Sequence, residues 1–327
     1  MSSFFDVYGH EEIIKNLGKS LNAMSYSHAY IFDGVMGVGK KLLAGIFAKA
    51  LQCSSESARP CNECISCRAF GVGNHPDIMY VVPSGKTLGV DDIREQVGNV
   101  VHVRPYAYLH KIFIIHGADQ MTVAAQNALL KTLEEPLSYA VFLLISENFN
   151  NFLPTILSRC VTLKLKPLSS ELVEQYLTKQ GYELSEARAT SIASGGSIGQ
   201  AMTLISDETF KEHQKEVHDI LNSLPRASLW DILLLAKRLE KLKEHSARSL
   251  SFIQMWYRDA LTYKATESSE RFIQKDLERS IITFSDAMSF KQLIAGMGAA
   301  RDAGYNLGAN SNYLLTMEVM LMKMAGR

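Results

Sequence analysis

Between residues 29 and 52 an apolar segment, a glycine-rich loop and a helical pattern follow one another. The segment AYIFDG (29–34) has the composition of a strand, and KLLAGIFAKALQ (41–52) has the pattern of a helix. The loop between them, GVMGVGKK (34–41), matches G-x-x-x-x-G-K over its first seven positions. A strand that enters such a loop and a helix that leaves it form the setting in which these loops bind phosphate groups. The sequence therefore predicts a phosphate-loop α/β domain.

Further segments of strand length alternate with helical patterns in the first half of the chain. The predicted strands are 77–83, 111–117, 139–146 and 161–166, and the predicted helices are 90–101 and 123–135. Strands that alternate with helices indicate a parallel sheet with helices on both faces.

The strand-like patterns end at Pro167, and only helical patterns such as 227–245 and 310–324 follow. Trp230 and Trp256 fall in these patterns, and we expect both to lie in the core. The predicted domains are an α/β phosphate-loop domain at 1–166 with an insertion at about 53–67, a small helical domain at 167–206 and a larger helical domain at 207–327.

The charge balance argues against a broad electrostatic attraction to nucleic acid or membranes. Lys+Arg and Asp+Glu both number 34, so DNA could bind only through a local basic patch. Hydrophobic residues make up 47% and charged residues 21%, which favours a folded globular protein over a disordered one. The apolar segments are too short to span a bilayer, and the N-terminus lacks a signal-peptide pattern. We therefore expect a soluble, cytoplasmic protein with no membrane partner.

Four of the five cysteines lie within fifteen residues after the first predicted helix: Cys53, Cys61, Cys64 and Cys67. In a cytoplasmic chain, clustered thiols are more often metal ligands than disulfides. Their spacing lets a folded loop bring several thiolates around one ion, and structural Zn²⁺ sites take four sulfur ligands with no open position. The pattern predicts a structural Zn²⁺ site.

Two alternatives to zinc stay open at the level of sequence. An iron–sulfur cluster uses a similar spacing, but the ferredoxin pattern continues to a fourth cysteine and a proline, whereas RAFGVG follows here. The other alternative is that the thiols bind no metal. We expect Cys160, far along the chain, to be a packed small residue and not a fifth ligand.

The glycine loop keeps only part of a nucleotide site. Gly34, Gly37 and Gly39 let the backbone curl around phosphate groups, and Lys40 stands where the phosphate-binding lysine belongs. At the next position Lys41 replaces the Ser or Thr that holds Mg²⁺, and its charge would repel the metal. The loop is therefore degenerate, although ATP binding without hydrolysis stays open.

Hydrolysis also requires an acidic pair at the end of a neighbouring strand. In KIFIIHGADQM, His116 and Gly117 occupy these two positions, and Asp119 follows two residues too late. Because neither a metal-binding carboxylate nor a general base is in place, we expect no ATP hydrolysis by this chain.

Several motifs in succession resemble one known family. HAYIFDGVMGVGKK, the cysteine insertion, IIHGADQM, AQNALLKTLEEP and LPTILSRC occur in the order found in bacterial clamp-loader subunits, which are AAA+ proteins of the DNA polymerase III holoenzyme. The resemblance implies that the three predicted domains are an AAA+ domain, a helical lid and a collar that joins subunits. It also implies partners: motor subunits of the gamma/tau type, the delta subunit and, through the complex, the sliding clamp and primer-template DNA.

Within this family the motor subunits carry the catalytic groups, whereas the delta prime class commonly lacks them. This chain departs from the motor pattern at Lys41, His116 and Gly117, and also at Gly199, where motor subunits have a sensor arginine. The delta prime pattern fits all four positions. The last three residues of LPTILSRC, Ser158–Arg159–Cys160, form an intact SRC motif. In the family, the arginine of this motif reaches the ATP of a neighbouring subunit. The resemblance therefore implies that Arg159 is an arginine finger that acts in trans.

The sequence thus favours a non-catalytic clamp-loader subunit that scaffolds the loader and activates its neighbour during clamp loading. One alternative is an active clamp-loader ATPase resembling gamma/tau, in which turnover would depend on Lys40. The other is a stand-alone zinc-dependent DNA-binding protein, which the net charge of zero disfavours.

Overall fold

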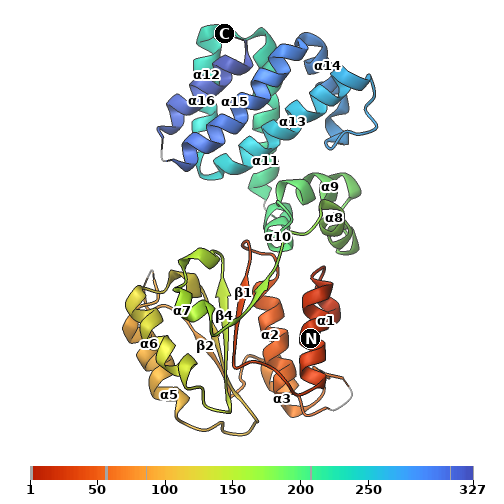
Figure 1. Cartoon of the computed structure of the whole chain (residues 1–327). Helices are drawn as coiled ribbons and strands as arrows, with labels where there is room; N and C mark the ends of the chain where they lie inside the picture. Colours follow the sequence, from red (N-terminus) through yellow and green to blue (C-terminus); the bar gives the residue numbers. More distant parts are fainter. Residues whose placement is uncertain (1–2, 56–57, 86, 207, 310, 327) are drawn as a thin grey trace. The chain divides into compact units, whose positions relative to one another are not determined.

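The computed structural model describes the chain except for residues 1–2, 56–57, 86, 207, 310 and 327 (Figure 1). Positions 56 and 57 in the predicted insertion, 207 at the predicted start of the third domain and 310 at the start of the last predicted helix therefore lie outside the described residues. The chain divides into two compact units. The first comprises Met1–Leu172 with Gly196–Gly199, and the second comprises Val173–Gly195 with Gln200–Arg327.

The first unit is built on a five-stranded sheet in which every pair of neighbouring strands is parallel. Its strands are β1 (Ala29–Asp33), β2 (Ile78–Val81), β3 (Lys111–Ile115), β4 (Ala140–Ser146) and β5 (Val161–Lys164), in the order β2-β3-β4-β1-β5. All five predicted strands are confirmed. The carboxyl end of β1 leads into the glycine loop, so the loop lies at the edge where parallel α/β sheets place their ligand sites.

Helices cover both faces of this sheet, as the alternation predicted (Figure 1). The helical segments of the first unit are η1 (Phe4–Asp6), α1 (Glu11–Asn22), α2 (Lys40–Leu51), α3 (Ile65–Gly71), α4 (Val90–Ile93), η2 (Arg94–Gly98), α5 (Asn99–Val101), η3 (Ala118–Gln120), α6 (Val123–Glu134), η4 (Phe149–Asn151) and α7 (Pro154–Leu157). The predicted helix 90–101 is one continuous run, α4-η2-α5, with a π-helical turn in the middle.

The period of two along the strands decides which residues face which layer. Tyr30 and Phe32 of β1 pack in the cluster with α1 and α2, whereas Ala29 and Ile31 pack in the cluster with α6 on the opposite face. Because both faces are covered, β3 and β4 are buried along their whole length.

The described residues of the second unit form helices and connecting turns, with no strand among them. The helical segments from residue 170 onward are α8 (Ser170–Lys179), α9 (Leu184–Ala193), α10 (Ile198–Ser206), α11 (Glu208–Ser223), η5 (Leu224–Arg226), α12 (Leu229–Glu240), η6 (Lys243–His245), α13 (Ser246–Thr266), η7 (Lys275–Leu277), α14 (Glu278–Ala287), α15 (Phe290–Gly308) and α16 (Tyr313–Met324). The first residues of α8 (Ser170–Leu172) and of α10 (Ile198–Gly199) belong to the first unit.

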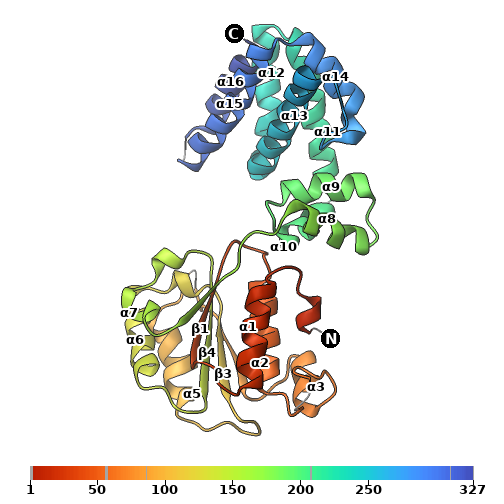
Figure 2. The same cartoon turned by 45° about the vertical axis from the view of Figure 1, so that its right-hand side comes forward.

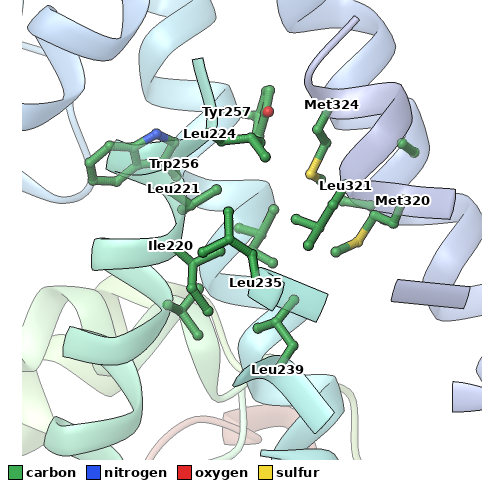
Figure 3. Packing of buried hydrophobic residues seen from close by; sticks show 14 of the residues in the cluster. Ile220, Leu221, Leu224, Leu235, Leu239, Trp256, Tyr257, Met320, Leu321 and Met324 are labelled. Atoms are coloured by element: carbon green, nitrogen blue, oxygen red, sulfur yellow. The ribbon is translucent and has the colours of Figure 1, made fainter. Parts of the chain in front are cut away.

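A single apolar core joins α11, α12, α13, α15 and α16 in the second unit. Figure 3 shows Leu221 of α11, Leu235 of α12, Trp256 of α13 and Leu321 of α16 converging in it. Trp256 is completely buried, as predicted, but Trp230 at the start of α12 is 70% exposed. The prediction of a core position for Trp230 is therefore wrong, because helical periodicity identifies an apolar face without showing whether that face is covered.

None of the helices in the described part of the chain combines the length and the apolarity that a membrane span requires.

Candidate functional site

The glycine loop between β1 and α2 is closed by the chain's own donors. Lys40 is 5% exposed, and its Nζ donates to the carbonyl oxygens of Gly34 and Val35, the latter at 2.9 Å. On the far side of the loop, His10 Nε2 lies 3.2 Å from the carbonyl oxygen of Val38, which can only accept. The lysine that would reach a bound phosphate is thus turned back onto its own loop.

Two further carbonyl groups of the loop are bound by the segment Gly196–Gly199. Ser197 Oγ donates to the Met36 carbonyl over 2.8 Å, and the Gly199 backbone N–H donates to the Gly37 carbonyl over 3.0 Å. A Cβ atom at position 199 would lie 2.8 Å from Gly37 Cα, closer than real Cβ contacts allow. Position 199 is therefore one where only glycine fits, and all carbonyl oxygens from residue 34 to 38 have a partner.

Acidic groups of the first unit balance the charge of Lys40. Burial lowers the pKa of Lys40, and the negative charges of Glu147, Asp33 and Asp119 oppose that shift. The Glu147 carboxylate lies 3.9 Å from Lys40 Nζ. Asp119 is buried in η3, and its Oδ2 accepts from the Asn148 N–H over 3.2 Å. The sequence predicts that Asp119 lies beyond the end of the strand. Its negative charge nevertheless acts to raise the pKa of Lys40.

At the end of β3 the two positions of the acidic pair carry no carboxylate. The His116 ring stacks on Tyr80 with 5.9 Å between ring centroids. Burial lowers the pKa of His116, and the charge of Lys41 adds to that shift. Gly117 follows in the left-handed backbone region, with φ of 61°. A neutral imidazole and a glycine offer neither a Mg²⁺ ligand of the usual oxygen type nor a carboxylate base.

Arg159 lies at the surface between α7 and β5. Its Nη2 pairs with Glu134 Oε1 at 2.8 Å, and its Nη1 donates to the Thr155 carbonyl at 3.0 Å and to Ser158 Oγ at 3.1 Å. The side chains of Arg159 and Glu134 are 35% and 44% exposed. The arginine is therefore ordered by its own chain and still accessible from outside.

The four clustered cysteines converge around the N-terminus of α3. This helix packs beside α2, and Figure 2 shows its place in the first unit. All four Sγ atoms lie within 4.8 Å of one another, so these residues can hold a metal ion. Three backbone N–H groups point at sulfur over 3.4 Å: that of Cys61 at Cys53, that of Cys64 at Cys61, and that of Cys67 at Cys64. Such N–H donors favour the thiolate form, which is the form that binds metal.

The four thiols differ in their acidity. Burial raises the pKa of Cys53 and of Cys67. At Cys64 burial acts in the same direction, but hydrogen bonds from the Cys67 and Ser54 backbones outweigh it and bring the pKa to about 6. The N–H groups of Cys64 and Glu63 lower the pKa of Cys61. Cys160 packs at the edge of the α6 core cluster and is not part of this group, as predicted.

A buried lysine supports the turn between the second and third cysteines. Lys49 of α2 is 1% exposed, and its Nζ donates to Asn62 Oδ1. Asn62 has φ of 66°, the left-handed conformation that a tight turn between Cys61 and Cys64 requires. The Lys49 ammonium also lies 5.9 Å from the centre of the Phe70 ring in α3.

The sequence predictions named the loop, the arginine and the cysteines, but not the residues that support them. Ser197, Glu134 and Lys49 were missed because each meets its partner through the tertiary fold. Only weak signals in the sequence indicate that two of these residues have a special role. Lys49 lies inside an otherwise apolar helix, and Glu134 is an acidic residue at a helix C-terminus.

The chain matches two family models along most of its length. The model described as "DNA polymerase III, delta subunit" matches residues 9–169, and "DNA polymerase III, delta subunit, C terminal" matches residues 211–325. A solved structure of a DNA polymerase III gamma subunit-related protein from Thermotoga maritima is similar at 18% identity, with a TM-score of 0.44, over 95% of this chain and 99% of that one.

Curated relatives fall into two classes. DNA polymerase III subunit tau of Bacillus subtilis is 30% identical over 295 residues, but the match covers 83% of this chain and only 52% of the tau subunit. DNA polymerase III subunit delta′ of Bacillus subtilis is 30% identical over 314 residues, and that match covers 95% of this chain and 94% of the relative. Since the match to the delta′ subunit covers nearly the whole length of both chains, this chain belongs to the delta prime family of DNA polymerase III clamp-loader subunits.

Proposed function

We propose that this subunit does not hydrolyse ATP itself and instead supplies Arg159 in trans to ATP bound by a neighbouring motor subunit of the gamma/tau type. A guanidinium at the γ-phosphate stabilises charge in the transition state, and arginine fingers of this kind are worth about 10³–10⁵ in rate. The subunit would thereby act as a scaffold and activator while the loader places the sliding clamp on primed DNA.

The observation that carries this proposal is the closed glycine loop. In a working loop the lysine pairs with the β- and γ-phosphates. Here Lys40 donates to two carbonyl groups of its own loop, and Gly199 packs against Gly37 from outside. Lys41, His116 and Gly117 in addition supply no Mg²⁺ ligand of the usual kind. These features support a loop that has kept its shape as a structural element.

The test is ATP turnover by a reconstituted loader that contains this subunit, with clamp and primed DNA present. We expect Arg159→Ala to lower kcat by at least about 10²-fold and Lys40→Ala to leave kcat within about twofold. Binding of a fluorescent ATP analogue to the isolated subunit should be undetectable at micromolar concentrations. Nucleotide binding that Lys40→Ala abolishes, together with loss of turnover, would instead support the active-ATPase alternative.

For the four cysteines we propose a structural Zn²⁺ ion. Four thiolate ligands with no open position suit zinc and leave no place for a substrate. Metal analysis of the purified chain should find about one zinc per chain, and Cys64→Ser should reduce that content. Iron with visible absorption would favour a cluster, and a protein equally stable with and without chelator would favour unliganded thiols.

We further propose the setting in which this subunit works. It would belong to a cytoplasmic complex with motor subunits of the gamma/tau type and the delta subunit, and would contact the clamp and primer-template DNA through that complex. The similarity to tau and gamma subunits of DNA polymerase III supports the clamp-loader setting. In it, residues 1–166 would act as the AAA+ domain, 167–206 as the lid and 207–327 as the collar. Co-purification of the subunit with its partners, and loss of this association when 207–327 is deleted, would test the division.

A further inference from the structure

Three groups of the chain itself hold the Arg159 guanidinium, and one of them is charged. Two are local: the carbonyl of Thr155 and the hydroxyl of Ser158 belong to the α7 turn that precedes the arginine. The third, Glu134, is the last residue of α6 and reaches Arg159 from 25 positions earlier in the sequence. The acidic contact is therefore made by the tertiary fold.

We propose that Glu134 is a positioning residue for Arg159: the ion pair fixes the guanidinium so that its remaining donors face an acceptor on a neighbouring subunit. This inference rests on the proposed function of Arg159 as a finger in trans. The acceptor is a phosphate group of the nucleotide that the neighbour holds, since phosphate matches the planar fork of N–H groups in arginine.

The donor count supports this role. A guanidinium has five N–H donors. Nη1 donates to Thr155 and Ser158, and Nη2 forms the ion pair with Glu134, whereas the Nε–H has no hydrogen-bond partner in the described part of the chain. A guanidinium held at Nη1 and Nη2 can therefore still offer its Nε–H to a phosphate oxygen. The ion pair thus leaves the finger both anchored and able to bind.

Anchoring matters because an arginine side chain has many rotamers of similar energy. An unanchored finger must be ordered each time the neighbouring site reacts, whereas a guanidinium already in place loses little freedom. A displacement of about 1 Å in a catalytic group can cost 10²-fold in rate. We therefore expect loss of Glu134 to lower kcat on the order of tenfold, which is less than the loss of the guanidinium itself.

The experiment measures clamp- and DNA-stimulated ATP turnover by the reconstituted loader with variants of this subunit. Glu134→Gln removes the charge and keeps the shape, and Glu135→Gln is the matched control, because Glu135 is the next residue, is exposed and carries the same charge. We expect Glu134→Gln to lower kcat on the order of tenfold with KM for ATP unchanged, Glu134→Asp to restore part of the rate, and Glu135→Gln to stay within about twofold.

A double variant separates positioning from general structural damage. In the Arg159→Ala background, Glu134→Gln should cause no further loss, because the group that it positions is gone. An equal loss in both backgrounds would overturn the proposal, and so would a Glu134→Gln loader that is as fast as the unmodified loader or faster. If Arg159→Ala itself leaves turnover intact, the proposed function fails and this inference fails with it. A large effect of Arg159→Ala with none of Glu134→Gln defeats the inference alone.

Discussion

Gly199 donates its backbone N–H to the carbonyl oxygen of Gly37 over 3.0 Å, and this contact joins the segment Gly196–Gly199 to the glycine loop. The missing side chain at position 199 is what lets the segment Gly196–Gly199 approach the glycine loop. A side chain at position 199 should therefore disturb the loop.

We expect Gly199→Ala to lower the free energy of unfolding by about 1–3 kcal/mol, because the new Cβ would lie 2.8 Å from backbone and cannot be accommodated without a shift. The control is Gly18→Ala in α1, where a Cβ meets nothing within 4 Å and alanine should stabilise the helix by about 0.5–1 kcal/mol. Urea titration followed by circular dichroism measures both. Equal stability of the two variants would show that the loop moves aside freely.

His116 should make the chain less stable in mild acid. Burial lowers its pKa from the ordinary value of 6.5, so the unfolded chain binds more protons than the folded chain between pH 6.5 and the lowered value. The contribution of His116 to the free energy of unfolding is thus complete above pH 6.5. It is lost as the pH falls from 6.5 to the lowered pKa of His116. Replacement by glutamine should make the pH dependence of the free energy of unfolding shallower there.

Urea titrations between pH 5 and 7.5 check this expectation, with His102→Gln as the matched variant because His102 is exposed. Glutamine at position 116 also removes the stacking on Tyr80, so the slope against pH is the informative quantity, not the absolute stability. Identical slopes for the unmodified chain and His116→Gln would contradict the assignment.

Lys49 should slow the loss of metal from the cysteine site. Four thiolates around a divalent ion leave a net charge of −2, and a buried ammonium that binds the turn residue Asn62 offsets part of it. We expect Lys49→Met to release zinc to a chelator on the order of tenfold faster, as is usual for residues that support metal ligands.

The matched control for this prediction is Lys41→Met, an exposed lysine of the same helix. Zinc release can be followed with a coloured chelator on the intact chain. Equal release rates for the two variants would mean that Lys49 supports the fold of α2 and not the metal site.

Truncation of the two tryptophans of the second unit should change the free energy of unfolding by very different amounts. Trp256→Ala removes a fully buried ring from the core and should cost about 3–5 kcal/mol. Trp230→Ala changes a ring that is 70% exposed and should alter the free energy of unfolding by less than about 0.5 kcal/mol. If residues 207–327 form the collar, the same Trp230 variant should join the loader less well in gel filtration. A stability loss at Trp230 as large as that at Trp256 would argue against its exposed position.

Much of the fold could be predicted from local sequence. The strands of the first unit, the helices α2 and α6 and the cysteine cluster all follow from features that lie within a few residues of one another, such as hydrophobic period, glycine loops and ligand spacing. The identity of single residues likewise shows that Lys41 offers no hydroxyl group and that His116 and Gly117 offer no carboxylate.

The tertiary structure alone determined the contact partners and the burial of several residues. Ser197 and Gly199 close a loop about 160 positions earlier, Glu134 pairs with Arg159 from a different helix, and Trp230 stays outside while Trp256 is buried. Each of these outcomes depends on which surfaces meet after the elements pack. Periodicity and spacing carry no information about partners that are distant along the chain, because burial and hydrogen bonding are set by the folded neighbours of a residue and not by its neighbours in sequence.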